Sequence, residues 1–493
     1  MKTYRAVAGV LSLLMLCALF ACGAPSLQDA PMAEACASPV PVQVLAHPEP
    51  AQEGYAQAHR YLAPEQSVEE YIYLALLAEK SEIDILDYEI PAAQISDLYT
   101  RVMNTHPDLF YVQPGISYTY TSSGLVVALK PSYYMTQEER ERADAYCAQR
   151  LDEICAGVDA QWSDFEIALY LHDYLCTNFS YDKTYRIYDM YGFLKEGTGV
   201  CQAYTLTYMA LLARYGIKSD VAVSQSMNHI WNVVVLGGAA YHVDVTWDDP
   251  VPDASGRALH SNFLRSDAGI QSTEHYAWES DLTCSSGVYE TTFVVDVDTP
   301  YAYTAGQWFF ADGKERAIFE ADFSTMSATK FMEINEKWMT PEGNSYYLDA
   351  FCGVGTYRGN LIYNTPDRIM AYNLQSGVTV DLGISIPRTK QIYGLMVQGQ
   401  EIVYRIADEP GADMEVLRYT ISDLADYLWG DADQNGFVDG RDVTAIRRYL
   451  AGLPTVCHTG AADLDDNGRV DERDVEILRQ YLVENNESSY HGG

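Results

Sequence analysis

A single cysteine, Cys201, stands directly behind Gly-Thr-Gly-Val and ahead of an apolar pattern at helical spacing that Gly216 ends. A cysteine at a helix N-terminus meets free backbone N–H groups and the positive end of the helix dipole, which favour thiolate over thiol. Gly197 and Gly199 would let the backbone approach a substrate and leave the N–H of Cys201 free to bind an oxyanion. Cys201 is therefore a candidate nucleophile.

A thiolate needs a base, and a predicted hairpin supplies one. Two alternating apolar runs flank Gly237-Gly238, which predicts a two-residue turn. In that register Trp231 lies opposite Asp244, and His229 lies on the same face, diagonal to Asp244. His229 would take the thiol proton and later protonate a leaving amine, while Asp244 would orient the imidazole and stabilise its charge.

Each of these residues has a simpler interpretation. A lone cysteine at a helix start more often packs in a core, and His242 on the neighbouring strand is expected to be a core residue. Asp248 and Asp249 are expected to cap a turn before Pro250. The combination of Cys201 with a diagonal His–Asp pair favours catalysis, and the alternative is a fold that kept its shape but serves binding.

The strings GVCQAY, NHIWNVV and YHVDVTWDDP, with NFSYD upstream, resemble the transglutaminase-like, papain-like cysteine enzyme superfamily. The resemblance runs from about Asp164 to Asp253, and the spacings of 28 and 15 between Cys201, His229 and Asp244 fit it. Ala203 stands where many members carry glycine. The resemblance implies an α+β core and a thioester intermediate that water or an amine resolves.

The elements around these strings follow ordinary helix and strand signals. Ser67 is expected to cap a helix, and further helices are predicted over 92–106, 137–157 and, after the cap Ser163-Asp164, 165–179. Short aromatic strands are predicted over 109–112, 116–121 and 125–130. Cys147 and Cys155 lie eight residues apart on one predicted helix, too far along its axis to form a disulfide with each other.

Beyond about Val288 the pattern changes to strands and turns. GQWFF at 306, GNLIY at 359 and GQEIVY at 399 look alike, and each is followed by a turn and a second strand. This weak repeat has roughly the length of a propeller blade. Three units are too few to close a propeller, so an open or irregular β domain is expected.

The C-terminal segments 431–442 and 463–474 each fit a twelve-residue calcium loop, with glycine at position six. Side-chain oxygens occupy positions one, three, five, nine and twelve, and position seven offers a backbone carbonyl. The expected ligands of two Ca²⁺ ions are Asp431, Asp433, Asn435, Phe437, Asp439, Asp442, Asp463, Asp465, Asn467, Arg469, Asp471 and Asp474. No cofactor is expected for catalysis.

Each loop leads into a short helix, and the two units repeat after 32 residues, with Arg447 matching Arg479 and Ile446 matching Leu478. About 60 residues resemble a type I dockerin, a small α module with paired EF-hand-like calcium loops that binds a cohesin domain of a scaffoldin. By that resemblance the cohesin contacts are Arg441, Arg447, Arg448, Arg473, Arg479 and Gln480. The near-duplication implies two equivalent docking poses. A looser alternative is calcium binding without a cohesin partner.

The chain of 493 residues is too long for one core, and its formal charge of -37 argues against a nucleic-acid partner. Basic residues followed by the apolar run Val7–Ala21 predict a signal peptide. The residues around Cys22 resemble a lipoprotein cleavage box, which implies a lipid anchor at Cys22 as the alternative to plain secretion. Either way the protein is expected outside the membrane: extracellular, on the cell surface or bound to a cellulosome.

The expected organisation is multidomain. The ranges are a signal peptide over 1–21, a linker over 22–54, an N-terminal α/β region over 55–160, a transglutaminase-like catalytic core over 161–284, a β-rich blade-like domain over 285–428, a dockerin over 429–485 and a tail over 486–493.

The sequence thus favours a secreted, cellulosome-associated cysteine enzyme that acts on peptide or carboxamide bonds of proteins. Hydrolysis is preferred over transglutamination because bacterial members of the superfamily are often protease-like. The rival from another class is a non-catalytic module that binds protein or cell wall within a polysaccharide-degrading complex. The only reason to consider a glycoside hydrolase is that dockerins commonly occur beside such enzymes. No pair of carboxylates in the sequence supports that chemistry.

Overall fold

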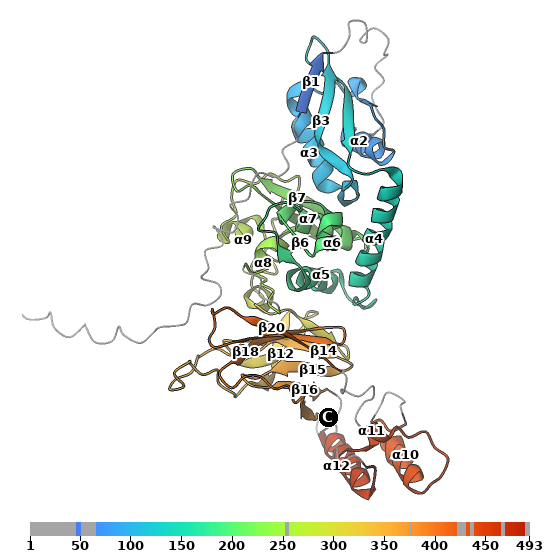
Figure 1. Ribbon diagram of the computed structural model, residues 1–493, viewed down its shortest axis with the longest axis vertical. Coiled ribbons are helices and arrows are strands. Elements are labelled where there is room, and N and C mark those ends of the chain that lie inside the picture. The colour runs from blue at the N-terminus through green and yellow to red at the C-terminus, as the bar shows by residue number, and fades with distance from the viewer. Residues whose placement is uncertain are drawn as a thin grey trace, which may run out of the picture.

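The computed structural model describes residues 46–50, 66–251, 256–374, 377–421, 430–433, 438–464 and 469–488. The signal peptide and Cys22 lie outside these residues, as do Asn435, Phe437, Asp465 and Asn467. The described parts follow one another along the long axis of the molecule, from the N-terminal region through the core and the β sheets to the C-terminal helices (Figure 1).

The N-terminal region is a small mixed sheet with helices beside it. Its strand order is β1-β3-β4-β2. The strands are β1 Ala46–Pro50, β2 Ile83–Asp84, β3 Val112–Tyr120 and β4 Val126–Tyr133, and the helices are α2 Val68–Leu77 and α3 Ile95–Thr105, with 3-10 turns η3 Leu86–Tyr88, η4 Ala92–Gln94 and η5 Pro107–Leu109. Ser67 caps α2 as predicted, since its hydroxyl accepts from the N–H of Glu70.

Two expectations for this region differ from the structure. Strand β1 lies inside the range predicted as a linker, because it pairs in parallel with β3, which no local signal announces. The strand predicted over 109–112 begins only at Val112, since Pro107 stands in the first turn of η5 and starts a 3-10 turn there instead.

Two long helices lead into the core. They are α4 Gln137–Cys155 and α5 Asp164–Asn178. Thr136 and Ser163 form capping boxes with glutamates three residues on, which is why the two helices start where they do. Cys147 and Cys155 are both free thiols.

The core contains a buried helix, α7, that packs against a three-stranded antiparallel sheet ordered β7-β8-β9. Its elements are β5 Ser180–Tyr181, α6 Met190–Glu196, β6 Thr198–Gly199, α7 Cys201–Ala213, β7 Lys218–Ser224, β8 His229–Leu236, β9 Ala239–Val243, α8 Val245–Asp248 and α9 Asp267–Ser272. The hairpin has the predicted register, with Leu236 opposite Ala239. Both Gly237 and Gly238 have positive φ, as a two-residue turn of this kind requires.

The β-rich part consists of three consecutive antiparallel sheets, one for each predicted repeat. The first holds β10 Ala302–Thr304, β11 Gln307–Asp312, β12 Ala317–Asp322 and β13 Ser327–Glu333; the second holds β14 Val354–Tyr357, β15 Asn360–Asn364, β16 Ile369–Asn373 and β17 Thr379–Asp381; the third holds β18 Gln391–Gln398, β19 Glu401–Ala407 and β20 Glu415–Thr420. One face of the first sheet and the preceding 3-10 turn η6 Phe293–Asp296 pack into the hydrophobic cluster of the core, whereas Phe309, Ala311 and Ile318 on the other face pack with residues of the second and third sheets.

The C-terminal helices are α10 Gly440–Leu450, α11 Thr459–Ala462 and α12 Glu472–Ser488. Ile446 and Leu478, the positions that match across the internal repeat, are both buried in one small cluster. Among the described residues, the helices are too short or too polar to cross a bilayer.

Candidate active site

Cys201 is the first residue of α7, as the glycine-flanked sequence predicts. Its N–H therefore has no acceptor within the helix and is free in principle to bind an oxyanion. The side chain is 5% exposed and packs among Met209, Val221 and Ile230. The thiol is thus held at the positive end of a buried helix rather than on an open surface.

The two glycines before Cys201 have different structural roles. Gly197 ends α6 in the left-handed conformation, with φ 72°. A Cβ on Gly199 would lie 2.5 Å from Phe193 and 2.7 Å from the Cβ of Ala203. The close packing of Gly199 against α6 and α7 therefore explains both the glycine and the small residue at 203.

A loop organised by Asp182 holds the chain just ahead of the nucleophile. The Asp182 carboxylate accepts the N–H groups of Arg186 at 2.7 Å and Ile187 at 3.1 Å. The carbonyl of Ile187 in turn accepts the N–H of Val200 at 2.9 Å. Asp182 belongs to the NFSYD string, but its role could not be inferred from the sequence.

His229 and Asp244 meet as the hairpin register predicts. The Nε2 of His229 lies 2.6 Å from Oδ2 of Asp244, and both side chains are buried. Asp244 also caps α8, since its Oδ1 accepts the N–H groups of Thr246 at 3.0 Å and Trp247 at 3.2 Å. Both oxygens of the Asp244 carboxylate are therefore held by hydrogen bonds. Because Nε2 of His229 faces Asp244, Nδ1 is the ring nitrogen that can contact the thiol of Cys201.

The electrostatics of this pair favour a protonated imidazole. Burial alone would lower the pKa of His229, but Asp244 and the sulfur of Cys201, the other polar partner of the ring, place it well above its ordinary value. Burial alone would raise the pKa of Asp244, and the charges and hydrogen bonds of His229 and His275 hold it well below its ordinary value. Asp244 therefore favours the imidazolium form of His229 beside the sulfur of Cys201.

His275 is a member of this site that the sequence analysis missed. Its Nε2 lies 2.9 Å from the same Oδ2 of Asp244. It lies 31 residues after Asp244, outside the strings quoted above, so no local pattern could have located it. We call Cys201, His229, Asp244 and His275 the Asp244 cluster.

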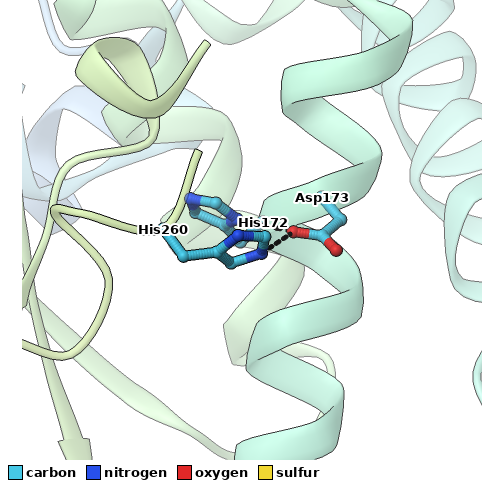
Figure 2. Close-up of side chains that lie close together, drawn as sticks. All are labelled: His172, Asp173 and His260. Atoms are coloured by element: carbon cyan, nitrogen blue, oxygen red, sulfur yellow. Dashed lines mark hydrogen bonds and ion pairs between the residues drawn. The ribbon is translucent and has the colours of Figure 1, made fainter. Parts of the chain in front are cut away.

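The core contains a second buried cluster of the same composition. We call Cys176, His172, Asp173 and His260 the Asp173 cluster. Figure 2 shows both imidazoles turned toward one carboxylate oxygen of Asp173, on α5. The distances are 2.9 Å from His172 Nδ1 and 2.8 Å from His260 Nε2. The other oxygen accepts the N–H of Tyr301, so the cluster ties the core to the segment entering the first β sheet.

The remaining polar residues near the hairpin have structural contacts. His242 is a core residue, as expected: it accepts from the indole of Trp231 at 3.0 Å and pairs with Asp267. Asp248 and Asp249, which were expected to cap a turn before Pro250, are both buried, and their carboxylates contact other parts of the core. Asp248 accepts from Asn262 and His172, and Asp249 from the hydroxyl of Tyr204, because α8 turns both carboxylates inward.

A cavity of about 480 Å³ borders the surroundings of Cys201. Helix α3, strand β7 and the segment 279–281 supply most of its lining. Val221 from this lining packs in the same cluster as Cys201, and Asn104 accepts a hydrogen bond from Gln202, the residue after the nucleophile. This cavity is a candidate route by which a substrate reaches the thiol.

The described parts of the two C-terminal loops bring carboxylates together. Ligand oxygens of Asp431, Asp433 and Asp442 lie within 4.8 Å of one another. Burial and the neighbouring charges of Asp433 and Asp431 raise the pKa of Asp442, a crowding that a divalent cation would relieve. In the second loop Asp474 accepts the N–H of Asp471 at 2.8 Å, as Asp442 does from Asp439. These oxygens fit the hard-cation chemistry of calcium.

The other predicted ligands and cohesin contacts that the structure describes lie in the second loop and on the two longer helices. Asp463, Arg469 and Asp471 are the described positions one, seven and nine of the second loop. The side chains predicted to face a cohesin lie exposed on or beside α10 and α12, at Arg441, Arg447, Arg448, Arg473, Arg479 and Gln480. Several of them also have contacts within the module: Arg441 pairs with Asp439, Arg448 donates to the carbonyl of Pro454, and Arg479 pairs with Glu476.

Comparison with known families locates two of the parts. The model of the transglutaminase-like superfamily matches residues 152–247, and that of the dockerin type I domain matches residues 429–483. No curated protein matches this chain. A solved structure titled "Crystal structure of a TGase" matches at 12% identity and a TM-score of 0.21, over 29% of this chain and 46% of that one. The matched part of this chain thus spans under half of the length of that structure. By the family matches, this chain contains a transglutaminase-like domain followed by a C-terminal type I dockerin domain.

Proposed function

We propose that this protein is an extracellular cysteine enzyme that acts on peptide or carboxamide bonds of proteins through Cys201, His229 and Asp244. The observation that carries the proposal is the buried His229–Asp244 pair beside a cysteine at the first position of α7. That arrangement supplies a nucleophile, a base and a group that orients the base.

The reaction follows from these positions. The thiol proton moves to Nδ1 of His229, and Sγ adds to the substrate carbonyl to give a tetrahedral oxyanion near the N–H of Cys201. The imidazolium then protonates the leaving amine, and a thioester remains. Water or a primary amine, deprotonated by His229, attacks the thioester and restores the thiol. Water makes the enzyme a peptidase or amidase, and an amine makes it a transglutaminase.

Hydrolysis is the favoured outcome because of the resemblance to bacterial, protease-like members of the superfamily. The second candidate function is a non-catalytic module that binds protein or cell wall, and the low exposure of Cys201 is the observation that favours it.

The test is release of ammonia or peptides from protein substrates, with and without an added primary amine. We expect Cys201→Ala to abolish release while the fold survives, because alanine suits a helix and is close in size. Incorporation of the amine would identify a transglutaminase. Equal activity of Cys201→Ala and the unaltered protein would leave the binding module as the explanation.

The C-terminal module would attach this enzyme to a cohesin of a scaffoldin, and so to a cellulosome outside the cell. Type I dockerins typically bind calcium, and Asp431, Asp433 and Asp442 are arranged to contribute to such a site. The residues expected to face the cohesin lie on two similar helices, which favours two docking poses. Mutating either face alone should leave cohesin binding nearly intact, and mutating both should abolish it; loss of binding from one change would refute the two poses.

Calcium should also be needed for folding of this module. We expect chelation to remove the helical circular dichroism signal of the isolated segment 429–485, and calcium to restore it. An unchanged spectrum in chelator would contradict the calcium assignment.

A further inference from the structure

The cavity that borders Cys201 has a strongly acidic lining. Its volume is about 480 Å³, and two residues of its lining, Val221 and Val223, pack in the same hydrophobic cluster as Cys201. Among the described residues, the lining holds one basic side chain, Arg101, and five acidic ones, which are Glu69, Asp97, Asp220, Glu279 and Asp281. The proposed reaction uses this cavity as a route to the thiol and gives its charge no role.

The acidic side chains come from four separate segments of the chain. Glu69 lies on α2 and Asp97 lies on α3. Asp220 lies on β7, and Glu279 and Asp281 lie in the segment that follows α9. Two backbone hydrogen bonds, of 2.9 and 3.0 Å, hold Glu279 beside β7. A charged run on one helix would be an ordinary solvated face, but here the tertiary fold places the carboxylates around one space.

Only part of this charge is neutralised within the protein. Arg101 forms an ion pair with Asp281. Among the described residues, no basic side chain forms an ion pair with the other four carboxylates of the lining. Glu69 and Asp220 are partly buried, so solvent and salt screen them less than they screen an exposed carboxylate. The cavity is therefore suited to a positively charged ligand.

A buried amide at the wall of the cavity has an unused acceptor. Gln202, the residue after the nucleophile, is 8% exposed, and its Nε2 donates to Oδ1 of Asn104 in the lining at 3.0 Å. Its Oε1 is buried and has no hydrogen-bond partner among the described residues. A buried acceptor without a partner is unfavourable, and an N–H group of a ligand in the cavity would satisfy it.

We propose that this cavity binds a positively charged side chain of the protein substrate, beside the bond that Cys201 attacks, and so directs the enzyme to basic sequences. This inference rests on the proposed function. A guanidinium carries five N–H donors and no acceptor, which matches a lining of carboxylates with the Oε1 of Gln202 at its wall.

Two carboxylates belong to the part of the lining that packs with the nucleophile. Asp220 directly precedes Val221, and Glu279 forms its backbone hydrogen bonds with Val223. Val221 and Val223 both pack in the cluster that contains Cys201. Asp220 and Glu279 are therefore the specificity-determining residues of this proposal.

The charge of the cavity should act on the rate at which a substrate reaches the thiol. A cleft lined by charges of one sign raises the encounter rate of oppositely charged molecules by roughly tenfold or more at low salt. The whole chain is acidic, with a formal charge of -37, so a cationic molecule is favoured to some degree everywhere on its surface. A specific cavity predicts a larger preference at Cys201 than at Cys155 and Cys457, the partly exposed cysteines of the same molecule.

The test measures how fast chloroacetyl peptides alkylate Cys201 in the full chain, read by mass spectrometry, so it needs no natural substrate. The peptides carry arginine, its neutral analogue citrulline, or glutamate, placed before the reactive group in one series and after it in another. Asp220→Asn and Glu279→Gln, alone and combined, remove charge from the cavity and preserve side-chain size. Glu141→Gln, exposed on α4, removes an equal charge elsewhere and is the matched control.

We expect the arginine peptide of at least one series to label Cys201 about tenfold faster than its citrulline analogue at low salt, with the glutamate peptide slowest. This rate ratio should exceed the ratio at Cys155 and Cys457. It should fall toward one in the double variant and at high salt, where screening is strong, and stay unchanged in Glu141→Gln.

The outcomes separate the two proposals. Equal labelling of Cys201 by the arginine and citrulline peptides in both series refutes the inference alone. An arginine preference that survives intact in the double variant also refutes it, because the charge of the cavity would not be its cause. Labelling of Cys201 by every peptide no faster than that of Cys155 and Cys457 in the unaltered protein refutes the proposed function itself, since the thiol would not be activated.

Discussion

The Asp244 cluster and the Asp173 cluster contain the same four residue types, a cysteine, an aspartate and two histidines, and lie in the same domain. In both, one carboxylate oxygen is shared by two imidazoles while the other accepts backbone N–H groups. Both are buried. Composition and burial therefore do not distinguish an active site from a structural one here.

The position of the cysteine does distinguish them. Cys201 is the first residue of α7, whereas Cys176 lies in the last turn of α5 and donates to the carbonyl of Val245 at 3.6 Å. A helix N-terminus stabilises a thiolate and a C-terminus disfavours it. Burial raises the pKa of Cys176 to about 12, so this thiol stays protonated.

The partners of the imidazole differ as well. His172 faces carboxylates at both nitrogens, Asp173 at 2.9 Å and Asp248 at 3.2 Å. His229 faces a carboxylate at Nε2 only. A base needs a ring nitrogen that faces the thiol without a competing carboxylate. Nε2 of His172 lies 3.9 Å from Sγ of Cys176, but Asp248 contacts the same nitrogen. The comparison teaches that helix position and a free ring nitrogen, rather than the residue set, make a nucleophile.

The sharpest way to break this comparison is to remove each cysteine. Cys201→Ala should lower turnover at least about 10⁴-fold, as loss of a triad nucleophile does. Cys176→Ala should leave turnover unchanged and cost roughly 1 kcal/mol of unfolding free energy. Activity assays and denaturant unfolding of both variants check this. A reversed pattern would mean that the wrong cluster was chosen.

The histidines should separate in the same way. His229→Ala should reduce turnover by roughly 10³-fold or more, because the thiol loses its base. His172→Ala leaves Asp173 and Asp248 as buried carboxylates without their shared partner, so it should lower the unfolding free energy by about 3–5 kcal/mol. Turnover per folded molecule should survive in His172→Ala, and its loss would count against a purely structural role for that cluster.

The two aspartates give a smaller contrast. Asp244→Asn should lower turnover by roughly 10²- to 10³-fold, less than loss of the thiol or the base, if Asp244 only orients and stabilises the imidazole. Asp173→Asn should leave kcat close to that of the unaltered protein. Measuring kcat of Asp244→Asn and Asp173→Asn side by side tests this contrast. An equal loss of kcat in the two variants would contradict a catalytic role for Asp244 and a structural role for Asp173.

Acid should weaken the Asp173 cluster within a defined window. Burial alone would raise the pKa of Asp173, but His260 and His172 hold it at about 2. Because this pKa is depressed, the carboxylate stabilises the fold fully above its unfolded value near 4 and loses that effect as pH falls toward 2. The difference in Tm between the unaltered protein and Asp173→Asn should therefore narrow from pH 4 to 2, and a constant difference would contradict the assignment.

Much of the candidate site could be predicted because its parts are close in sequence. The turn at Gly237-Gly238 sets the hairpin register, and the register alone places His229 diagonal to Asp244. The start of α7 follows from local spacing. The internal repeat likewise places Ile446 and Leu478 in one core.

The rest depends on contacts between distant segments. His275 reaches Asp244 from a loop beyond α9, and His260 reaches Asp173 across 87 residues, so no spacing rule applies. Strand β1 forms by pairing with β3 rather than from its own pattern. The packing of Gly199 against Phe193 likewise cannot be read from the sequence.

The most direct test of the central claim is the relative reactivity of the cysteines in the unaltered protein at mildly acidic pH. Cys155 and Cys457 are more exposed than Cys201, so accessibility alone predicts that they are labelled first. Partial burial raises the pKa of both thiols, so neither is activated. We predict that iodoacetamide labels Cys201 before either, because only Cys201 combines a helix N-terminus with His229. Labelling of Cys155 and Cys457 ahead of Cys201, or at the same rate, would contradict an activated nucleophile.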